Sequence, residues 1–253
     1  VRAAPVMVHA QPAVPGGRRR GGGPRGAAAI AAVGALALAA CRPLPPLARA
    51  PGADRAALVD RCERAFPVGP WEAVHVVEAS LPLQNQTALL GAISAAAPGL
   101  GFRSVLMAQE GLVLFDASYR SRAVQVHRAL PPFDHEGFGE GTVEDIRLLL
   151  FPAEGQLEEV GYAAGPLPAC RWVEGDGAVV EAAFPAADQL RIRRYDARGH
   201  LVRSADARGL DACGFAQQIE LEAPGAVGYR LRLSLVELTA PRCPSPVRVG
   251  AAE

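Results

Sequence analysis

The sequence predicts a mainly β protein in which about eleven antiparallel strands form a strongly curved sheet, with a helix between the two halves of the strand series. Short segments rich in Val, Leu and aromatic residues recur between turn residues such as Glu110-Gly111. In the segment 112–120, Val113 and Phe115 alternate with polar residues, as expected for a strand whose sheet contacts water on one face. The other face is apolar and must pack against something.

The elements are predicted in the following order. A first helix over 54–66 begins at Asp54 and ends before Pro67, where a proline stops it. The first series of strands covers 73–79, 87–95, 102–108, 112–120 and 123–129. A second helix, with a capping pattern at 142–145 and an apolar stretch to 151, is placed to plug the concave side of the sheet. The second series covers 171–174, 178–184, 190–196, 201–205, 217–222 and 229–238.

The first forty residues have the order of a secretory signal. Arginines at 18–20 and 25 precede an uncharged, apolar stretch over 27–40. That stretch is too short for a permanent membrane span and ends in Leu38-Ala39-Ala40-Cys41, which matches the bacterial lipobox. We therefore expect residues 1–40 to be a signal peptide and Cys41 to be acylated.

Acylation of Cys41 would anchor the protein to a membrane on its periplasmic face. Arg42, rather than the aspartate that retains lipoproteins in the inner membrane, follows the cysteine and favours the outer membrane. The predicted organisation is a signal peptide (1–40), a Pro-rich tether (41–53), one β domain (54–240) and a C-terminal tail (241–253). Because five of the 26 basic residues and no acidic residue lie in 1–40, the rest of the chain is acidic overall. This charge argues against nucleic acid as a partner.

Four cysteines remain once Cys41 is acylated, and an even number in an exported protein favours two disulfides. The candidates are Cys62, Cys170, Cys213 and Cys243. Three pairings are possible, and we expect Cys170 with Cys213 and Cys62 with Cys243. Four structural thiols are the alternative.

No constellation for catalysis, metal or cofactor binding is visible in the sequence. The four cysteines are at least 30 residues apart, with no histidine at ligand spacing. The cluster Asp134-His135-Glu136 lies in a Gly-rich loop and is interpreted as a solvated turn. Asp116 is interpreted as a residue of the polar sheet face and Asp145 as a helix cap. The sequence therefore predicts a protein that is not an enzyme and holds no metal.

Several segments carry a family resemblance: 102–108, 114–117, 194–196, 218–221 and the alternating strand 229–238. They resemble the LolA and LolB family of lipoprotein carriers, and especially LolB-like lipoproteins of unknown function. The resemblance implies an unclosed antiparallel β-barrel with capping helices, whose apolar concave side holds acyl chains. It assigns eight positions to the cavity side: Leu106, Val113, Phe115, Ile192, Ile219, Leu221, Leu231 and Leu233.

The resemblance also implies a function. We expect an outer-membrane lipoprotein that binds or helps to traffic lipids or acylated molecules, with a periplasmic carrier protein as a further partner. The alternative is a non-catalytic structural or interaction lipoprotein of the cell envelope. The alternation of apolar and polar residues does not distinguish between these two functions. A sheet face that lines a cavity and a sheet face packed against a helix have the same sequence pattern.

Overall fold

The computed structural model describes residues 44–80, 87–96, 101–225 and 228–240. The predicted signal peptide, Cys41 and the C-terminal tail with Cys243 lie outside these residues, so what was predicted for them stays a prediction. Neither of the two helices in the described part is long and apolar enough to span a bilayer.

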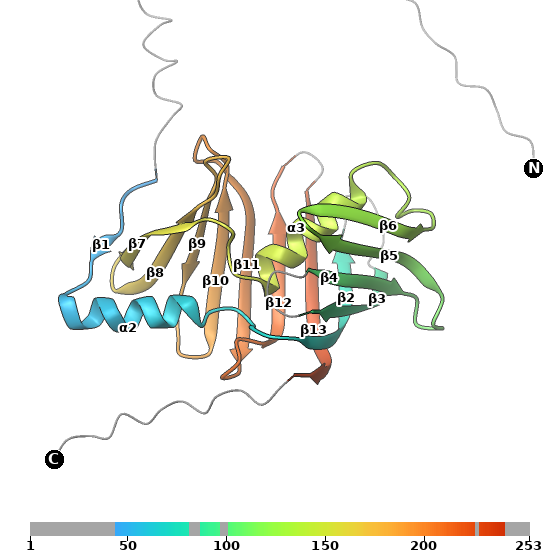
Figure 1. Ribbon diagram of the computed structural model, residues 1–253, viewed down its shortest axis with the longest axis horizontal. Coiled ribbons are helices and arrows are strands. Elements are labelled where there is room, and N and C mark those ends of the chain that lie inside the picture. The colour runs from blue at the N-terminus through green and yellow to red at the C-terminus, as the bar shows by residue number, and fades with distance from the viewer. Residues whose placement is uncertain (1–43, 81–86, 97–100, 226–227, 241–253) are drawn as a thin grey trace, which may run out of the picture. The chain divides into compact units, whose positions relative to one another are not determined.

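The described residues form two helices and thirteen strands (Figure 1). The helices are α2 (Gly52–Glu63) and α3 (Phe138–Leu150). The strands are β1 (Ala48–Arg49), β2 (Trp71–Ser80), β3 (Thr87–Ala95), β4 (Phe102–Met107), β5 (Val113–Arg120), β6 (Ala123–Ala129), β7 (Gln156–Ala163), β8 (Leu167–Val173), β9 (Val179–Ala183), β10 (Gln189–Tyr195), β11 (Leu201–Leu210), β12 (Ala216–Ala223) and β13 (Tyr229–Thr239).

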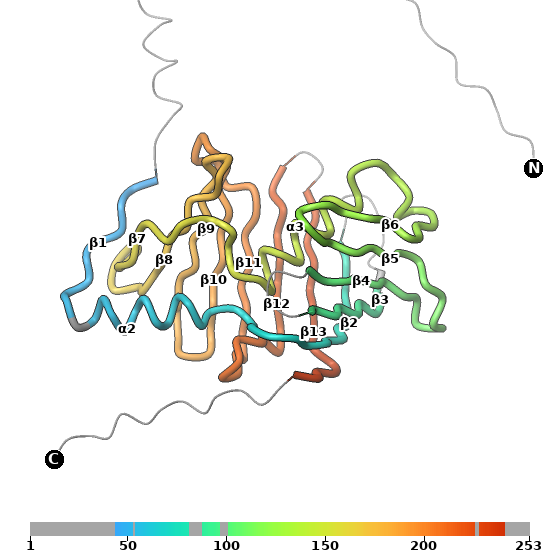
Figure 2. The backbone as a smooth tube through the Cα atoms, in the orientation of Figure 1, coloured from blue at the N-terminus to red at the C-terminus, as the bar shows by residue number. Residues whose placement is uncertain are grey.

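All thirteen strands belong to one antiparallel sheet, in the order β1-β7-β8-β9-β10-β11-β12-β13-β2-β3-β4-β5-β6. The last strand, β13, pairs with β2 and so joins the two halves of the series. The sheet curves but does not close, because β1 and β6 stand at its two ends (Figure 2). The predicted unclosed antiparallel barrel with capping helices is confirmed.

The pairing register puts apolar residues in rows across one face of the sheet. One such row runs from Ile192 through Ala205, Leu221 and Leu231 to Ala79, from β10 to β2. Helix α3 contacts strands from both halves of the sheet, β6 and β10, and buries Val143, Ile146 and Leu149 among other residues (Figure 1). The helix that the sequence placed between the two halves therefore fills the concave face.

Two strands were not predicted, and both lie at the β1 end of the sheet. β7 has the sequence QLEEVGYA, in which a bulge between Leu157 and Glu159 breaks the alternation of apolar and polar residues. β1 is only two residues long and lies within the predicted tether. Helix α3 also begins earlier than predicted, at Phe138, although Gly139 and Gly141 disfavour a helix there.

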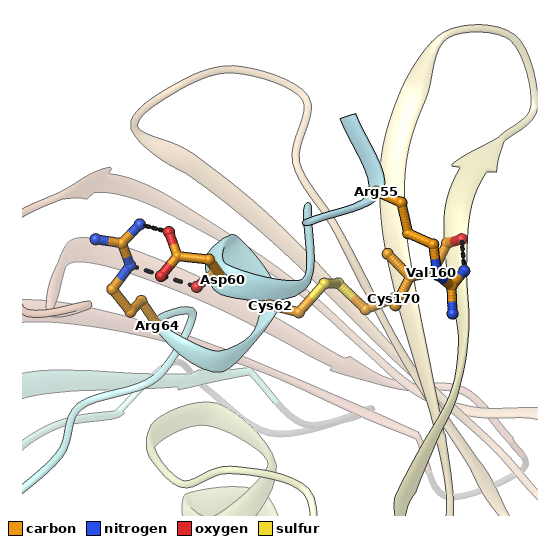
Figure 3. The surroundings of a disulfide bond; sticks show 6 residues. All are labelled: Arg55, Asp60, Cys62, Arg64, Val160 and Cys170. Atoms are coloured by element: carbon orange, nitrogen blue, oxygen red, sulfur yellow. Dashed lines mark hydrogen bonds and ion pairs between the residues drawn. A yellow bond between two sulfur atoms is a disulfide. The ribbon is translucent and has the colours of Figure 1, made fainter. Parts of the chain in front are cut away.

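The expected disulfide pairing is wrong. Cys62 of α2 is bonded to Cys170 of β8, with Cα atoms 6.2 Å apart (Figure 3). The physical reason is that α2 packs against β7 and β8, where the Arg55 guanidinium also donates a hydrogen bond of 3.2 Å to the Val160 carbonyl. Cys213 is also disulfide-bonded, so the alternative of structural thiols does not hold for the three candidate cysteines that the structure describes.

Candidate functional site

Two cavities border the segment 151–155, which connects α3 to β7 and is called the connector below. The apolar cavity has a volume of about 640 Å³ and the charged cavity a volume of about 710 Å³. Both are lined by residues 151–154, Arg122 and Arg147. Both volumes lie in the range of small-molecule sites, about 300–1,000 Å³.

Aromatic side chains form one wall of the apolar cavity. Trp71, Phe102 and Tyr119 lie on β2, β4 and β5, and the register joins them through Ala95 into one row on the concave face. The remaining apolar or small lining residues are Pro67, Val68, Gly69, Ala96, Gly101, Phe151, Pro152 and Ala153. The apolar cavity therefore lies at the end of the concave face that the sequence analysis identified.

Phe151 holds the connector against this wall. Its ring is stacked on Phe102 at 4.9 Å between centroids and lies 5.5 Å from Trp71. Offset and tilted ring pairs of this kind each add about 0.5–1.5 kcal/mol beyond the area that they bury. Phe151 thus packs against two of the three aromatic side chains that form this wall.

A glycine allows β4 and β5 to lie close together at the wall of the apolar cavity. Gly101 has a φ of +91°, and a Cβ atom at this position would lie 1.8 Å from the carbonyl oxygen of Tyr119. Any other residue would therefore push β4 away from β5 at the point where both line the cavity.

Ion pairs dominate the charged cavity. Arg194 contacts Glu174 at 2.9 Å and Asp176 at 3.5 Å, and Arg203 also lines the cavity. Arg194 and Arg203 thus already have carboxylate partners, and the cavity is lined by charges of both signs. We regard the apolar cavity as the candidate binding site.

Asp145 is not the helix cap that the sequence suggested. It lies in the middle of α3, is 6% exposed, and accepts a hydrogen bond of 2.8 Å from Arg203 Nε and another from the Tyr229 hydroxyl. Burial raises the pKa of Asp145 above its ordinary value, although the hydrogen bonds from Tyr229 and Arg203 act in the opposite direction. The cap interpretation failed because α3 begins seven residues earlier than Asp145, at Phe138.

Three charged side chains and the Tyr119 hydroxyl meet where the two cavities share a rim. Glu154 Oε1 accepts from Arg147 Nη2 at 2.7 Å and from the Tyr119 hydroxyl at 3.2 Å. Arg122 Nε lies 3.6 Å from Glu154 Oε2, beyond hydrogen-bond distance. The Arg147 guanidinium also lies over the Tyr119 ring, 5.1 Å from its centroid. The rim therefore holds two cations and one carboxylate.

The eight positions that the resemblance assigned to the cavity side do not line either of the two cavities. Phe115, Ile192, Ile219, Leu221 and Leu233 are buried in the core, with exposed fractions between 0 and 7%. Leu106, Val113 and Leu231 are half-buried. Their contact with a ligand stays a prediction.

The residues that line the apolar cavity were not singled out from the sequence. Aromatic residues make up only 6% of the chain, and Trp71, Phe102 and Phe151 each lie at the end of a strand or helix rather than inside an alternating segment. The sequence features that could have identified these residues are the scarcity of aromatic residues and their position at the ends of strands and helices.

Other polar clusters of the sequence have structural roles. Asp116 lies on the face opposite Phe115, where Arg103 Nε donates to it at 2.8 Å and holds its pKa below the ordinary value. His135 is exposed and its ring lies 2.9 Å from the Pro132 carbonyl. Among the described residues, no group of three potential ligands could hold a metal ion.

Comparison with solved structures identifies the fold. A LolA superfamily protein from Nitrosomonas europaea superposes with a TM-score of 0.50 at 9% sequence identity, over 75% of this chain and 94% of that protein. The chain has a LolA-like fold. No family model matches the sequence, and no curated protein matches it either.

Two further solved structures resemble the LolA-like domain less closely. One is an outer membrane lipoprotein-sorting protein domain from Vibrio parahaemolyticus, with a TM-score of 0.35, 11% identity and coverage of 74% of this chain and 92% of that one. The other is a DUF1329 family protein from Desulfovibrio piger, with a TM-score of 0.36, 11% identity and coverage of 81% and 96%.

Proposed function

We propose that this chain is a non-catalytic, lipid-anchored protein that binds the acyl chains of lipids or acylated molecules in the periplasm and takes part in their transport. The observation that carries the proposal is the apolar cavity at the end of the concave face, whose lining includes Trp71, Phe102 and Phe151. The LolA-like fold supports it, because the sequence resemblance implied acyl-chain binding on that face.

The energetics of such a cavity favour a hydrocarbon ligand. Transfer of one methylene group from water to an apolar environment contributes about 0.8 kcal/mol. About ten methylenes would contribute roughly 8 kcal/mol, which corresponds to micromolar affinity before the entropy cost of binding is subtracted.

The segment after Cys41 supports a close membrane position. Arg171 Nη1 donates to the Pro45 carbonyl at 2.7 Å, and the Leu47 amide donates to Glu159 Oε2 at 3.0 Å. Because a residue spans at most about 3.6 Å, the four steps from Cys41 to Pro45 cover no more than roughly 14 Å. Acylation of Cys41 would thus hold the domain near the periplasmic surface of the outer membrane, where a periplasmic carrier would deliver the ligand.

The full chain carrying Cys41→Ala, purified without detergent, should bind a fluorescent fatty acid with a micromolar Kd. Val68→Glu should weaken this binding about tenfold, because Val68 lines the apolar cavity and a carboxylate there opposes an apolar ligand. Val236→Glu is the matched control: Val236 is 62% exposed, Val68 is 64% exposed, and only Val68 lines a cavity.

Absence of wild-type binding would contradict the proposal, and so would equal weakening by both substitutions. A specific observation would then favour the alternative, a structural or interaction lipoprotein of the envelope. Phe115, on β5 near the β6 end of the sheet, is 1% exposed and packs edge to face on Phe138 of α3 at 5.0 Å. This part of the face is filled by protein.

A further inference from the structure

The charged residues that line the apolar cavity lie together at its rim. Twelve of its fifteen lining residues carry no charge, and the three charged ones are Arg122, Arg147 and Glu154. Arg147 is engaged by Glu154 at 2.7 Å and lies over the Tyr119 ring. Arg122 forms a longer ion pair of 3.6 Å with the same carboxylate, so two arginines share one acid and the rim of an otherwise apolar site carries one net positive charge.

Arg122 carries this excess charge. Its side chain is 79% exposed, and it makes no hydrogen bond within the part of the chain that the structure describes. Its nearest anionic atom, Glu154 Oε2, is 3.6 Å from Nε. An arginine presents five N–H donors in a planar fork, which suits the oxygen atoms of a carboxylate or phosphate.

The backbone at Arg122 is strained. The hairpin between β5 and β6 turns at Ser121 and Arg122, with φ values of 51° and 62°, and Arg120 pairs with Ala123. Two-residue hairpin turns of this kind favour Asn-Gly, because residues with a Cβ atom resist positive φ. An arginine therefore occupies a turn position at which glycine would be more stable. This arginine lines both cavities.

We propose that the ligand of the apolar cavity is an anionic amphiphile and that Arg122 binds the oxygens of its carboxylate or phosphate head at the rim. This inference rests on the proposed function and adds the charge class of the ligand to it. The acyl chain lies along Trp71 and Phe102, and the head remains at the rim, where Arg122 is exposed to solvent. Glu154 stays paired with Arg147.

The test compares three ligands with the same twelve-carbon chain: dodecanoate, dodecyl phosphate and the neutral ester monolauroylglycerol. Binding to the full chain with Cys41→Ala is measured by calorimetry below the critical micelle concentration. The wild type should bind both anions about tenfold more tightly than the neutral ester. Arg122→Gln should remove this preference and leave the affinity for the neutral ester unchanged. A preference for only one anion would identify a carboxylate or a phosphate as the head.

Two further variants separate binding from folding. Arg120→Gln removes an exposed arginine of the same hairpin that lines neither cavity, so it should keep the wild-type preference. Arg122→Gly should raise the melting temperature, because glycine tolerates a φ of 62°, and should still lose the preference for anions. Equal binding of all three ligands by the wild type would overturn the role of Arg122 and leave acyl binding intact. Failure to bind any of them would overturn the proposed function as well.

Discussion

The Arg203 guanidinium on β11 donates a hydrogen bond of 2.8 Å to the carboxylate of Asp145, in the middle of α3. Tyr229 on β13 donates to the other carboxylate oxygen. Two strands of the concave face thereby hold the helix that covers this face. The pair is largely desolvated, since the side chain of Asp145 is 8% exposed and that of Arg203 is 22% exposed.

Asp145→Ala should lower the free energy of unfolding by about 2–4 kcal/mol, because it leaves the Arg203 guanidinium and the Tyr229 hydroxyl without their acceptor in a desolvated site. Urea unfolding followed by fluorescence measures the change. The double variant Asp145→Leu with Arg203→Leu is the control, since apolar replacement of both partners should recover much of the loss. Equal or greater destabilisation of the double variant would show that the pair itself is not the cause.

Reduction of the Cys62–Cys170 disulfide should destabilise the domain. The bond closes a loop of 108 residues, for which the chain-entropy account gives about 4–5 kcal/mol. The variant with Cys62→Ala and Cys170→Ala should therefore unfold at a markedly lower urea concentration. Mapping of non-reduced peptides should recover the segments around Cys62 and Cys170 as one species. Recovery of Cys170 linked to Cys213 would instead support the pairing expected from the sequence.

The parts of the fold that could be predicted were those in which the local sequence shows a clear pattern of apolar and polar residues. β5 and β13 alternate apolar and polar residues, and both were placed correctly to within a residue or two. β7 could not be found, because Glu158, Glu159 and Gly161 occupy a strand that tertiary pairing stabilises on both sides. The first turn of α3 was not predicted because it is also stabilised by a tertiary contact. Phe138 packs on Phe115 and compensates for the glycines that follow it.

The candidate site was harder to predict than the fold. Its walls come from Pro67–Gly69, the connector and the ends of three strands, which approach one another only after the sheet has curved. The role of Asp145 was missed for a similar reason, because its partners Arg203 and Tyr229 are 58 and 84 residues away in the sequence. Periodicity predicts which face of an element is apolar, but it carries no information on such distant contacts.

Cys41 is predicted to be acylated, and Cys41→Ala should abolish the acylation. In cells grown with radiolabelled palmitate, the wild-type chain should incorporate label and fractionate with the outer membrane. The variant should remain unlabelled and should keep residues 1–40, because the thiol of Cys41 receives the lipid before the chain is cut. Substitution of Cys62, which is bonded to Cys170, is the control and should leave labelling unchanged. Label on the Cys41→Ala protein would show that the anchor lies elsewhere.

His75 on β2 should make stability depend on pH. The residue is 2% exposed, its Nδ1 lacks a hydrogen-bond partner among the described residues, and burial lowers its pKa from 6.5 to about 4. Between these values the unfolded chain binds the proton and the folded protein does not, so stability is full above pH 6.5 and falls by about 3 kcal/mol as the pH drops to about 4. His75→Leu should remove this loss, whereas the carboxylates titrate alike in both proteins. Urea unfolding at several pH values measures the difference. A variant that loses as much stability as the wild type over this range would exclude His75 as the cause.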